Sequence, residues 1–317
     1  MRVALFGSPT FALPVLDALL AHHKVVLVVA QPDKPAGRGN KLTAPPVAAR
    51  ARELGARLEQ PARLRRNEDF FERVKELELD VAVTAAYGKI LPQALLDIPK
   101  HGFLNVHASL LPKYRGAAPI QWALINGETE TGVSIMQTEA GLDTGPVRLV
   151  RQLGVGPDDT SLTLFDKLSV LGADALTDAL GKLERGELPS CPQNDAEATH
   201  APMLSKDDGR IRWDASAAQL YERYRGVYAW PGSFTTYNGK TLKVSQLSPV
   251  KTSVGGQPGE IVALSPEGIT VGCAEGAVLL RTVQPAGKPK MPAYDWANGY
   301  GVKPGTHLDE ARGEAHG

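Results

Sequence analysis

The sequence predicts an α/β protein with a Rossmann-like, mainly parallel sheet domain, followed by a smaller C-terminal β-barrel of the oligonucleotide-binding type. In the first half, short valine-rich apolar stretches alternate with amphipathic stretches, which is typical of β-α-β units. In the second half, short strand-like stretches follow one another across glycine-containing turns, which is typical of a small barrel. A chain of 317 residues is also too long for one ordinary core, so two domains are expected.

The strands expected in the first half are apolar runs bounded by turn residues, the usual pattern of buried parallel strands. They are RVALF (2–6), KVVLVVA (24–30), VAVTA (81–85), FLNVH (103–107), GVSIM (132–136) and VRLVRQLGV (147–155). Helices are expected over residues 10–21, 45–55 and 67–77, from about Pro119, and over about 161–183. Gly55 should end the second helix and Asn67 should cap the third.

The β-α-β pattern stops at Gly186, where a stretch with three prolines begins. We therefore expect a sheet domain over residues 1–185, a linker over 186–209 and the C-terminal barrel over 210–317. After RIRW (210–213), the last part should hold a helix over about 216–225. It should also hold the strands SFTTY, KTLKVSQLSPV, GEIVAL, GITVGCA and AVLLRTV.

The first strand-to-helix turn does not fit a dinucleotide site. Its sequence, Phe6-Gly7-Ser8-Pro9-Thr10-Phe11, lacks the G-x-G-x-x-G spacing that lets a backbone approach a pyrophosphate. The chain also has no P-loop. The sheet is therefore expected to carry another kind of ligand.

Composition indicates a globular cytoplasmic protein. Hydrophobic residues make up 43% and charged residues 22%, which excludes a disordered chain. The apolar start is interrupted by Gly7, Pro9 and Asp17, so it does not read as a signal peptide, and no run is long enough to span a membrane. Cys191 and Cys273 lie far apart and lack the CxxC spacing of metal or redox sites, which favours a reducing compartment.

Charge is balanced overall but not along the chain. The 35 basic and 35 acidic residues give no net field that would attract nucleic acid. Between residues 34 and 66, however, nine basic residues face two acidic ones, an excess of seven positive charges. Such a run is more often a solvated helix face, and its alternative is a surface that contacts phosphates. From residue 201 onward, thirteen basic residues face eleven acidic ones, so the second domain is only weakly basic.

The most specific motif is NVHASLLP (105–112), followed by KYRGAAPIQW and later by GLDTG (141–145). On a strand, Asn105 and His107 point to the same side, with Cα atoms about 6.7 Å apart, so an amide and an imidazole can reach one small group. The alternative is that His107 is an ordinary buried strand histidine and that Asp143 is an ordinary turn residue. A metal site is disfavoured, because His101 and His107 would be about 20 Å apart on one strand.

These motifs resemble those of folate-dependent formyltransferases. The segments QPDKPAGRGNKL (31–42), AAYGKILP (85–92), NVHASLLPKYRGAAPIQW and ETGVSIMQTEAGLDTGPV (130–147) occur in the order found in the methionyl-tRNA formyltransferase family. LSKDDGRIRW (204–213) and VQPAGK (283–288) are similar to that family as well. The resemblance implies a transferase of translation initiation with 10-formyltetrahydrofolate as donor, no metal, and initiator methionyl-tRNA as acceptor.

The chemistry of formyl transfer explains why such residues are needed. Transfer from a nitrogen donor to an amine creates negative charge on the formyl oxygen and releases a proton. Asn105 offers an N–H donor, and protonated His107 offers a second. Asp143 would favour the protonated imidazole and could accept the proton, directly or through water. No covalent nucleophile is required, because the acceptor amine attacks.

The resemblance also implies a role for each matching residue. The catalytic set is Asn105, His107 and Asp143. The folate site would be lined by Ser109, Leu110, Leu111 and Pro112, with Tyr87 and Gly88 nearby. The basic loop after the second strand would enter the acceptor-stem region of the tRNA, with Arg38 as its key residue and Lys34 and Lys41 beside it.

Two other functions remain open from the sequence. A formyltransferase acting on an amino sugar nucleotide shares the SLLPKYRG region, although the AGRG loop and the GLDTG form favour the tRNA enzyme. A noncatalytic RNA-binding protein on the same scaffold would be expected to lose at least one of Asn105, His107 and Asp143. All three are present.

Overall fold

The computed structural model describes residues 1–36, 41–250 and 256–309. The chain divides into two compact units, each made of segments that are not contiguous in sequence. Unit 1 comprises Met1–Ile120, Thr129–Val155 and Thr163–Pro202. Unit 2 comprises Gln121–Glu128, Gly156–Leu162 and Met203–Gly317. The division into residues 1–185, 186–209 and 210–317 stays a prediction.

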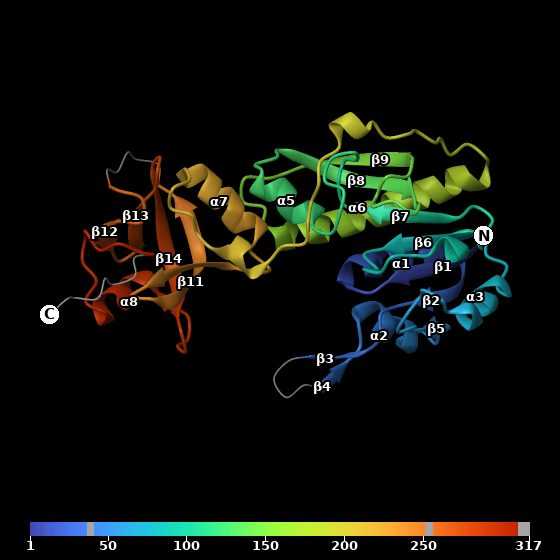
Figure 1. Ribbon diagram of the computed structural model, residues 1–317, viewed down its shortest axis with the longest axis horizontal. Coiled ribbons are helices and arrows are strands. Elements are labelled where there is room, and N and C mark those ends of the chain that lie inside the picture. The colour runs from blue at the N-terminus through green and yellow to red at the C-terminus, as the bar shows by residue number, and fades with distance from the viewer. Residues whose placement is uncertain (37–40, 251–255, 310–317) are drawn as a thin grey trace. The chain divides into compact units, whose positions relative to one another are not determined.

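Unit 1 is built on a seven-stranded sheet with the order β5-β2-β1-β6-β7-β8-β9 (Figure 1). Its strands are β1 (Arg2–Gly7), β2 (Lys24–Val29), β5 (Leu58–Glu59), β6 (Val81–Ala85), β7 (Phe103–His107), β8 (Glu130–Gln137) and β9 (Val147–Gly154). All pairs from β5 to β7 are parallel, whereas β8 and β9 are added antiparallel. The prediction of a mainly parallel sheet is confirmed.

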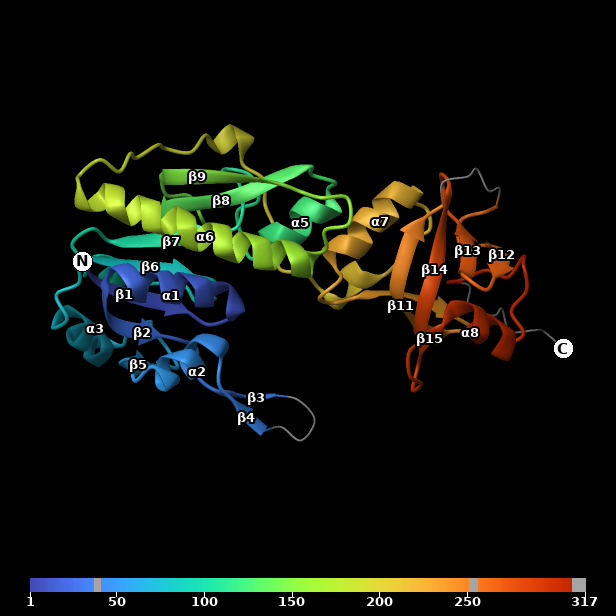
Figure 2. The ribbon, with the colours of Figure 1, turned by 180° about the vertical axis from the view of Figure 1, so that it is seen from behind.

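Different helices cover the two faces of this sheet. The helices are α1 (Leu13–His22), α2 (Pro46–Glu53), α3 (Glu68–Lys75), α4 (Gln93–Leu96) and α6 (Ser161–Glu184), with a 3-10 turn at Thr10–Ala12 before α1, whereas α5 (Pro119–Ile125) belongs mostly to unit 2. Helices α1 and α6 lie over one face (Figure 2). On the other face, alternate residues of four strands, such as Phe6 and Phe103, pack on Phe70 and Val74 of α3 and on Leu95 of α4.

Two helix-end residues predicted from the sequence, Asn67 and Gly55, have the expected roles in the structure. The backbone N–H of Phe70 donates to Oδ1 of Asn67 at 3.3 Å, so Asn67 caps α3 as expected. Gly55 follows α2 with φ +65°, a left-handed conformation that favours glycine. Short elements were not expected: β3 (Lys34–Ala36) pairs antiparallel with β4 (Lys41–Thr43) in a hairpin beside α2 (Figure 1).

Unit 2 holds an antiparallel sheet with the order β10-β11-β14-β13-β12, to which β15 adds on β14. The strands are β10 (Ser233–Tyr237), β11 (Lys240–Pro249), β12 (Ile261–Ser265), β13 (Gly268–Gly272), β14 (Ala277–Pro285) and β15 (Met291–Pro292). Helices α7 (Ala217–Gly226) and α8 (Ala293–Gly299) pack against it. The glycine-bounded strands read from the sequence are therefore present, and α8 lies in the tail that the sequence left unassigned.

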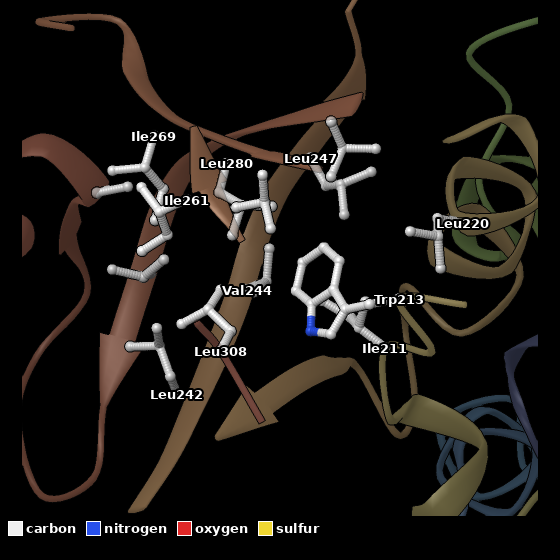
Figure 3. Close-up of a cluster of buried hydrophobic side chains, with 14 of the residues drawn as sticks. Ile211, Trp213, Leu220, Leu242, Val244, Leu247, Ile261, Ile269, Leu280 and Leu308 are labelled. Atoms are coloured by element: carbon white, nitrogen blue, oxygen red, sulfur yellow. The ribbon is translucent and has the colours of Figure 1, made fainter. Parts of the chain in front are cut away.

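The segment RIRW (210–213) contributes to the core of unit 2. Ile211 and Trp213 point into the cluster formed by Val244, Leu247 and Leu280 (Figure 3). The indole Nε1 of Trp213 donates to Oγ1 of Thr235 at 3.2 Å, so this buried polar group has a partner. Through these two side chains the segment forms part of the core of unit 2.

The described residues contain neither a candidate membrane-spanning helix nor a candidate metal-binding cluster. No helix there is both long enough and apolar enough to cross a bilayer. No group of three or more His, Cys, Asp or Glu side chains is arranged to hold a metal ion in the same part of the chain.

Candidate active site

The candidate site lies at the edge of the unit 1 sheet where the parallel strands β1, β6 and β7 end. The chain connects β1 to β2 on one side and, later, β6 to β7 on the other, so the strand order changes direction between β1 and β6. Ligands of open α/β sheets bind in the crevice outside such a switch point. The ends of β6 and β7 carry Thr84, Asn105 and His107.

Asn105 is oriented by the neighbouring strand. It lies directly opposite Thr84 of β6, and the Thr84 hydroxyl donates to its Oδ1 at 2.9 Å. Because the amide oxygen accepts this bond, the Nδ2 group is directed away from Thr84. Among the residues that the structure describes, Nδ2 has no hydrogen-bond partner and Asn105 is half-buried. The side chain therefore presents a free N–H donor.

His107 is buried, with only 5% of its surface exposed, and its two ring nitrogens have different surroundings. Nε2 lies 3.0 Å from the carbonyl oxygen of Tyr114. A carbonyl can only accept, so Nε2 carries the proton and Nδ1 bears the lone pair of the neutral ring. Nδ1 lies 3.7 Å from Oδ2 of Asp143, beyond hydrogen-bond distance. Nε2 therefore has a hydrogen-bond partner within the fold, whereas Nδ1 is available to interact with a substrate.

Asp143 reaches this site from the connection between β8 and β9. Its Oδ2 accepts the backbone N–H of Gly116 at 2.8 Å, which fixes the carboxylate on the side of His107. The backbone of Asp143 is in the left-handed region, with φ +52°, which is uncommon for a residue other than glycine. Gly145 follows on a tight path, because a Cβ there would come within 2.0 Å of the Gln137 carbonyl oxygen. The GLDTG turn is thus held in one conformation.

The segment 109–112 forms a turn that Ser134 of β8 holds. Ser134 Oγ accepts from the N–H of Leu111 at 3.1 Å and donates to the carbonyl of Ser109 at 2.8 Å. Ser109 is fully buried and its own hydroxyl donates to the carbonyl of Lys113 at 2.6 Å. Leu110, Leu111 and Pro112 are half-buried. That these four residues line a folate site stays a prediction, and the Ser109 hydroxyl is committed to the turn.

The loop after β6 places Tyr87 and Gly88 at the switch point. The Gln31 side chain donates to the Tyr87 carbonyl at 2.9 Å, and Gly88 has φ +74°. The Tyr87 ring is only 3% exposed and packs edge-on against Phe6. Its buried hydroxyl has no hydrogen-bond partner within the described part of the chain, and burial raises the pKa of this phenol well above its usual value. The pair lies beside the predicted folate site without a demonstrated contact to it.

The basic stretch is partly neutralised in the folded chain. Arg52 pairs with Asp33 at 3.1 Å, and Arg57 pairs with Glu59 at 3.5 Å. Within the described ranges, no ion pair is recorded for the exposed side chains of Lys34, Arg63, Arg65 and Arg66. Lys41 belongs to β4, and Arg38 lies outside the described residues. The tRNA roles of Lys34, Arg38 and Lys41 stay predictions.

Three contributors to the site were missed in the sequence. Thr84 is the one polar residue in the buried strand VAVTA, which is a signal that could have been used. Arg115 and Gln193 link the 114–116 turn to the GLDTG turn: Arg115 Nε donates to Gln193 Oε1 at 3.0 Å, and Gln193 Nε2 donates to the carbonyl of Asp143 at 2.8 Å. No sequence pattern shows that residues so far apart meet.

The arrangement combines a neutral N–H donor, an imidazole nitrogen and a carboxylate at one strand end. Such a set can stabilise negative charge on a carbonyl oxygen and accept a proton from an attacking amine. Both Cys191, which is exposed, and Cys273, which lies in unit 2, are absent from the set. The geometry therefore suits direct acyl transfer to an amine.

Comparison with known proteins assigns the chain to a family. Residues 1–180 match the family model described as formyl transferase, and residues 203–301 match the model of the formyl transferase C-terminal domain. The methionyl-tRNA formyltransferase of Deinococcus radiodurans is 54% identical over 308 residues, which is 97% of this chain and 96% of that protein. The chain belongs to the methionyl-tRNA formyltransferase family.

Other members of the methionyl-tRNA formyltransferase family match over their full length. The protein of Thermus thermophilus is 51% identical over 310 residues, covering 98% of this chain and all of that protein. That of Geobacter sulfurreducens is 44% identical over the whole chain. The predicted family, the predicted fold and the predicted enzyme class, a formyltransferase, are confirmed.

Solved structures with lower identity share the fold of this family. An N-formyltransferase from Helicobacter canadensis, described in complex with folinic acid and dTDP-3-aminofucose, has a TM-score of 0.69 at 15% identity. The match covers 88% of this chain and 98% of that one. HypX from Aquifex aeolicus in complex with tetrahydrofolic acid has a TM-score of 0.61 at 18% identity. This chain spans 47% of that longer protein.

Proposed function

We propose that the chain transfers the formyl group of 10-formyltetrahydrofolate to the α-amino group of methionine on initiator methionyl-tRNA. The observation that carries the proposal is the meeting of Asn105, His107 and Asp143 at one edge of the sheet, from two distant motifs. Full-length relatives named for this activity, at up to 54% identity, support the choice of acceptor. In the cell we place the reaction in the cytoplasm, where charged tRNA is used.

Asn105 would stabilise the negative charge that develops on the formyl oxygen. Its Nδ2 group is free because Thr84 already occupies Oδ1, so the donor is oriented before the substrate arrives. Donors fixed in this way need no reorganisation during the reaction, which is the main advantage of an oxyanion site.

His107 and Asp143 would handle the proton of the attacking amine. With Nε2 held by the Tyr114 carbonyl, only Nδ1 can exchange a proton, and it faces the carboxylate of Asp143. A proton on Nδ1, which faces this carboxylate, could be shared with the formyl oxygen as a second donor. Asp143 Oδ2 is anchored by Gly116, which leaves Oδ1 to accept from the amine directly or through water. As the new C–N bond forms, the bond between the formyl carbon and the folate nitrogen would break, and the proton taken from the amine would pass to that nitrogen, so that tetrahydrofolate leaves.

The residues around the switch point fit a folate. Leu110, Leu111 and Pro112 supply a half-buried apolar wall, and glycine at positions 7 and 88 lets neighbouring protein groups pack closely at the strand ends. At Gly7 a Cβ would come within 2.7 Å of the Ala12 Cβ. When bound, 10-formyltetrahydrofolate supplies the activated formyl group, and these residues bind and orient it.

The acceptor would be held by the basic side of unit 1. Cations without carboxylate partners are free to contact phosphates, which position an RNA without reading its sequence. Lys34 belongs to β3 and Lys41 to β4, and Arg63, Arg65 and Arg66 precede α3. Selection of the initiator tRNA is assigned to Arg38, which lies outside the described residues.

A direct assay tests the proposal and its rival. Purified protein is incubated with 10-formyltetrahydrofolate and either initiator methionyl-tRNA or a dTDP-amino sugar. We expect formylation of the tRNA alone, with a loss of at least about 100-fold for Asn105→Ala or Asp143→Asn. Formylation of the sugar would favour the alternative, and a near-wild-type rate in both variants would refute the site. Arg38→Ala should lower the preference for initiator over elongator tRNA.

A further inference from the structure

The segment 191–201 runs beside both turns of the candidate site, within unit 1. Thr199 Oγ1 accepts the N–H of Tyr114 at 2.9 Å, and the Thr199 carbonyl accepts the N–H of Arg115 at 2.9 Å. At its start, Cys191 exchanges backbone hydrogen bonds with Val147, just after the GLDTG turn. This part of the chain therefore braces the site from behind.

Gln193 makes the contact closest to the chemistry. Its Nε2 group donates one hydrogen bond to the carbonyl of Asp143 at 2.8 Å and one to the carbonyl of Gly145 at 2.7 Å. Both N–H donors of the amide are thus used on the backbone of the GLDTG turn. Gln193 is half-buried, which shields these bonds from water.

The orientation of the Gln193 amide is fixed by its other neighbour. The guanidinium of Arg115 can only donate, and its Nε lies 3.0 Å from Oε1 of Gln193. Arg115 is itself 5% exposed and donates from Nη2 to Asp195 at 2.8 Å. An obligate donor on one side and two obligate acceptors on the other permit only one orientation of the amide.

The turn that Gln193 holds is one that would otherwise relax. A residue other than glycine rarely adopts φ +52°, because its Cβ then lies close to the following carbonyl oxygen. Such a backbone persists only where its surroundings fix it. Loss of that conformation would move the Asp143 carboxylate away from both Gly116 and His107, although neither residue touches Gln193.

We propose that Gln193, oriented by Arg115, is a positioning residue that holds Asp143 against His107. This rests on the proposed function, in which Asp143 handles the proton of the attacking amine. The alternative is that Gln193 only stabilises the fold. The two can be separated because the amide has an isosteric carboxylate.

The decisive variant is Gln193→Glu. A carboxylate keeps the size of the side chain and its contact with Arg115, but it presents an acceptor to two carbonyl oxygens in place of two donors. We expect kcat to fall about 10- to 100-fold, the effect of a displacement of about 1 Å at a reacting group. The KM for methionyl-tRNA should change less than about threefold, and the thermal midpoint should stay close to that of the wild type.

Asn194→Ala is the matched control. Among the described residues, the neighbouring Asn194 side chain bonds only Ala196 and Glu197, so its removal perturbs the same segment without removing a hydrogen bond to either turn. Its kcat should equal that of the wild type. If Gln193→Glu and Asn194→Ala lower the thermal midpoint equally and neither changes kcat, the proposal is overturned.

A double-mutant cycle tests the route through Asp143. In an Asp143→Asn background, Gln193→Glu should cause little further loss of kcat, since the group that it positions is already inactive. Additive losses would overturn the proposal. If Asp143→Asn alone has a wild-type rate, the proposed function fails. If Asp143→Asn is slow and Gln193→Glu is not, only the positioning role fails.

Discussion

The hydroxyl of Thr84 on β6 donates a hydrogen bond of 2.9 Å to Oδ1 of Asn105 on β7. The two residues are direct partners in the parallel register. Thr84 thus decides which end of the Asn105 amide faces the open edge of the sheet. The proposed catalytic donor is thus oriented by a residue for which no catalytic role is proposed.

Replacing Thr84 with valine removes that bond and keeps the shape of the side chain. We expect kcat to fall about three- to tenfold, since one hydrogen bond contributes about 0.5–1.5 kcal/mol. Thr84→Ser should keep the wild-type rate. Steady-state kinetics with methionyl-tRNA measure both, and equal rates for the valine and serine variants would contradict the role of Thr84.

Gly145 should tolerate no side chain. A Cβ would lie 2.0 Å from the Gln137 carbonyl oxygen, so Gly145→Ala must displace the GLDTG turn at a cost of about 1–3 kcal/mol. Activity should fall with stability, as measured by denaturant unfolding. Gly154→Ala is the control, because a Cβ there meets no atom within 4 Å. A wild-type Gly145→Ala protein would show that the turn is adaptable.

The pair of Glu59 with Arg73 predicts a pH-dependent contribution to stability. Hydrogen bonding to Arg73, at 2.7 Å, lowers the pKa of Glu59 below its usual value. A lowered pKa stabilises the fold above the unfolded-state pKa of about 4.3, and this contribution disappears as the pH falls through the folded-state value. Glu59→Gln should therefore lower stability at pH 7 by about 0.5–1 kcal/mol. The difference in thermal midpoint should vanish in acid, and one that persists below pH 3 would argue against the ion pair.

The two cysteines should differ in reactivity. Burial raises the pKa of the Cys273 thiol to about 11, whereas Cys191 is exposed. Titration of the native protein with a thiol reagent at pH 8 should give one rapid equivalent, lost in Cys191→Ser, and a second only after denaturation. Rapid reaction of both thiols would mean that the core of unit 2 opens readily.

Arg63, Arg65 and Arg66 should contribute to tRNA affinity through charge alone. Changing all three to alanine should raise the KM for methionyl-tRNA and flatten its dependence on salt, because fewer counterions are released on binding. The matched control is Arg52→Ala, which removes a cation already paired with Asp33. An unchanged salt dependence would show that these three arginines are solvated and do not contact the tRNA.

Features that depend only on residues close together in the sequence could be predicted from it. The buried strands and the placement of Asn105 and His107 two residues apart on one strand follow from periodicity, and the Asn67 cap follows from one local hydrogen bond. The β3–β4 hairpin was missed because its strands are too short to show a period. The linkage of Arg115, Gln193 and Asp143 was missed because it depends on the path of residues 191–201, which no local pattern records.

The path of residues 191–201 limits how this protein can be divided. A fragment that ends at residue 180, where the first family match ends, would contain Asn105, His107 and Asp143 but would lack Gln193 and Thr199. Exchange of C-terminal domains between relatives should therefore succeed only when the junction follows Pro202, the last residue of unit 1. Residues 191–201, which resemble a linker in the sequence, would then have to stay with unit 1 and not with unit 2.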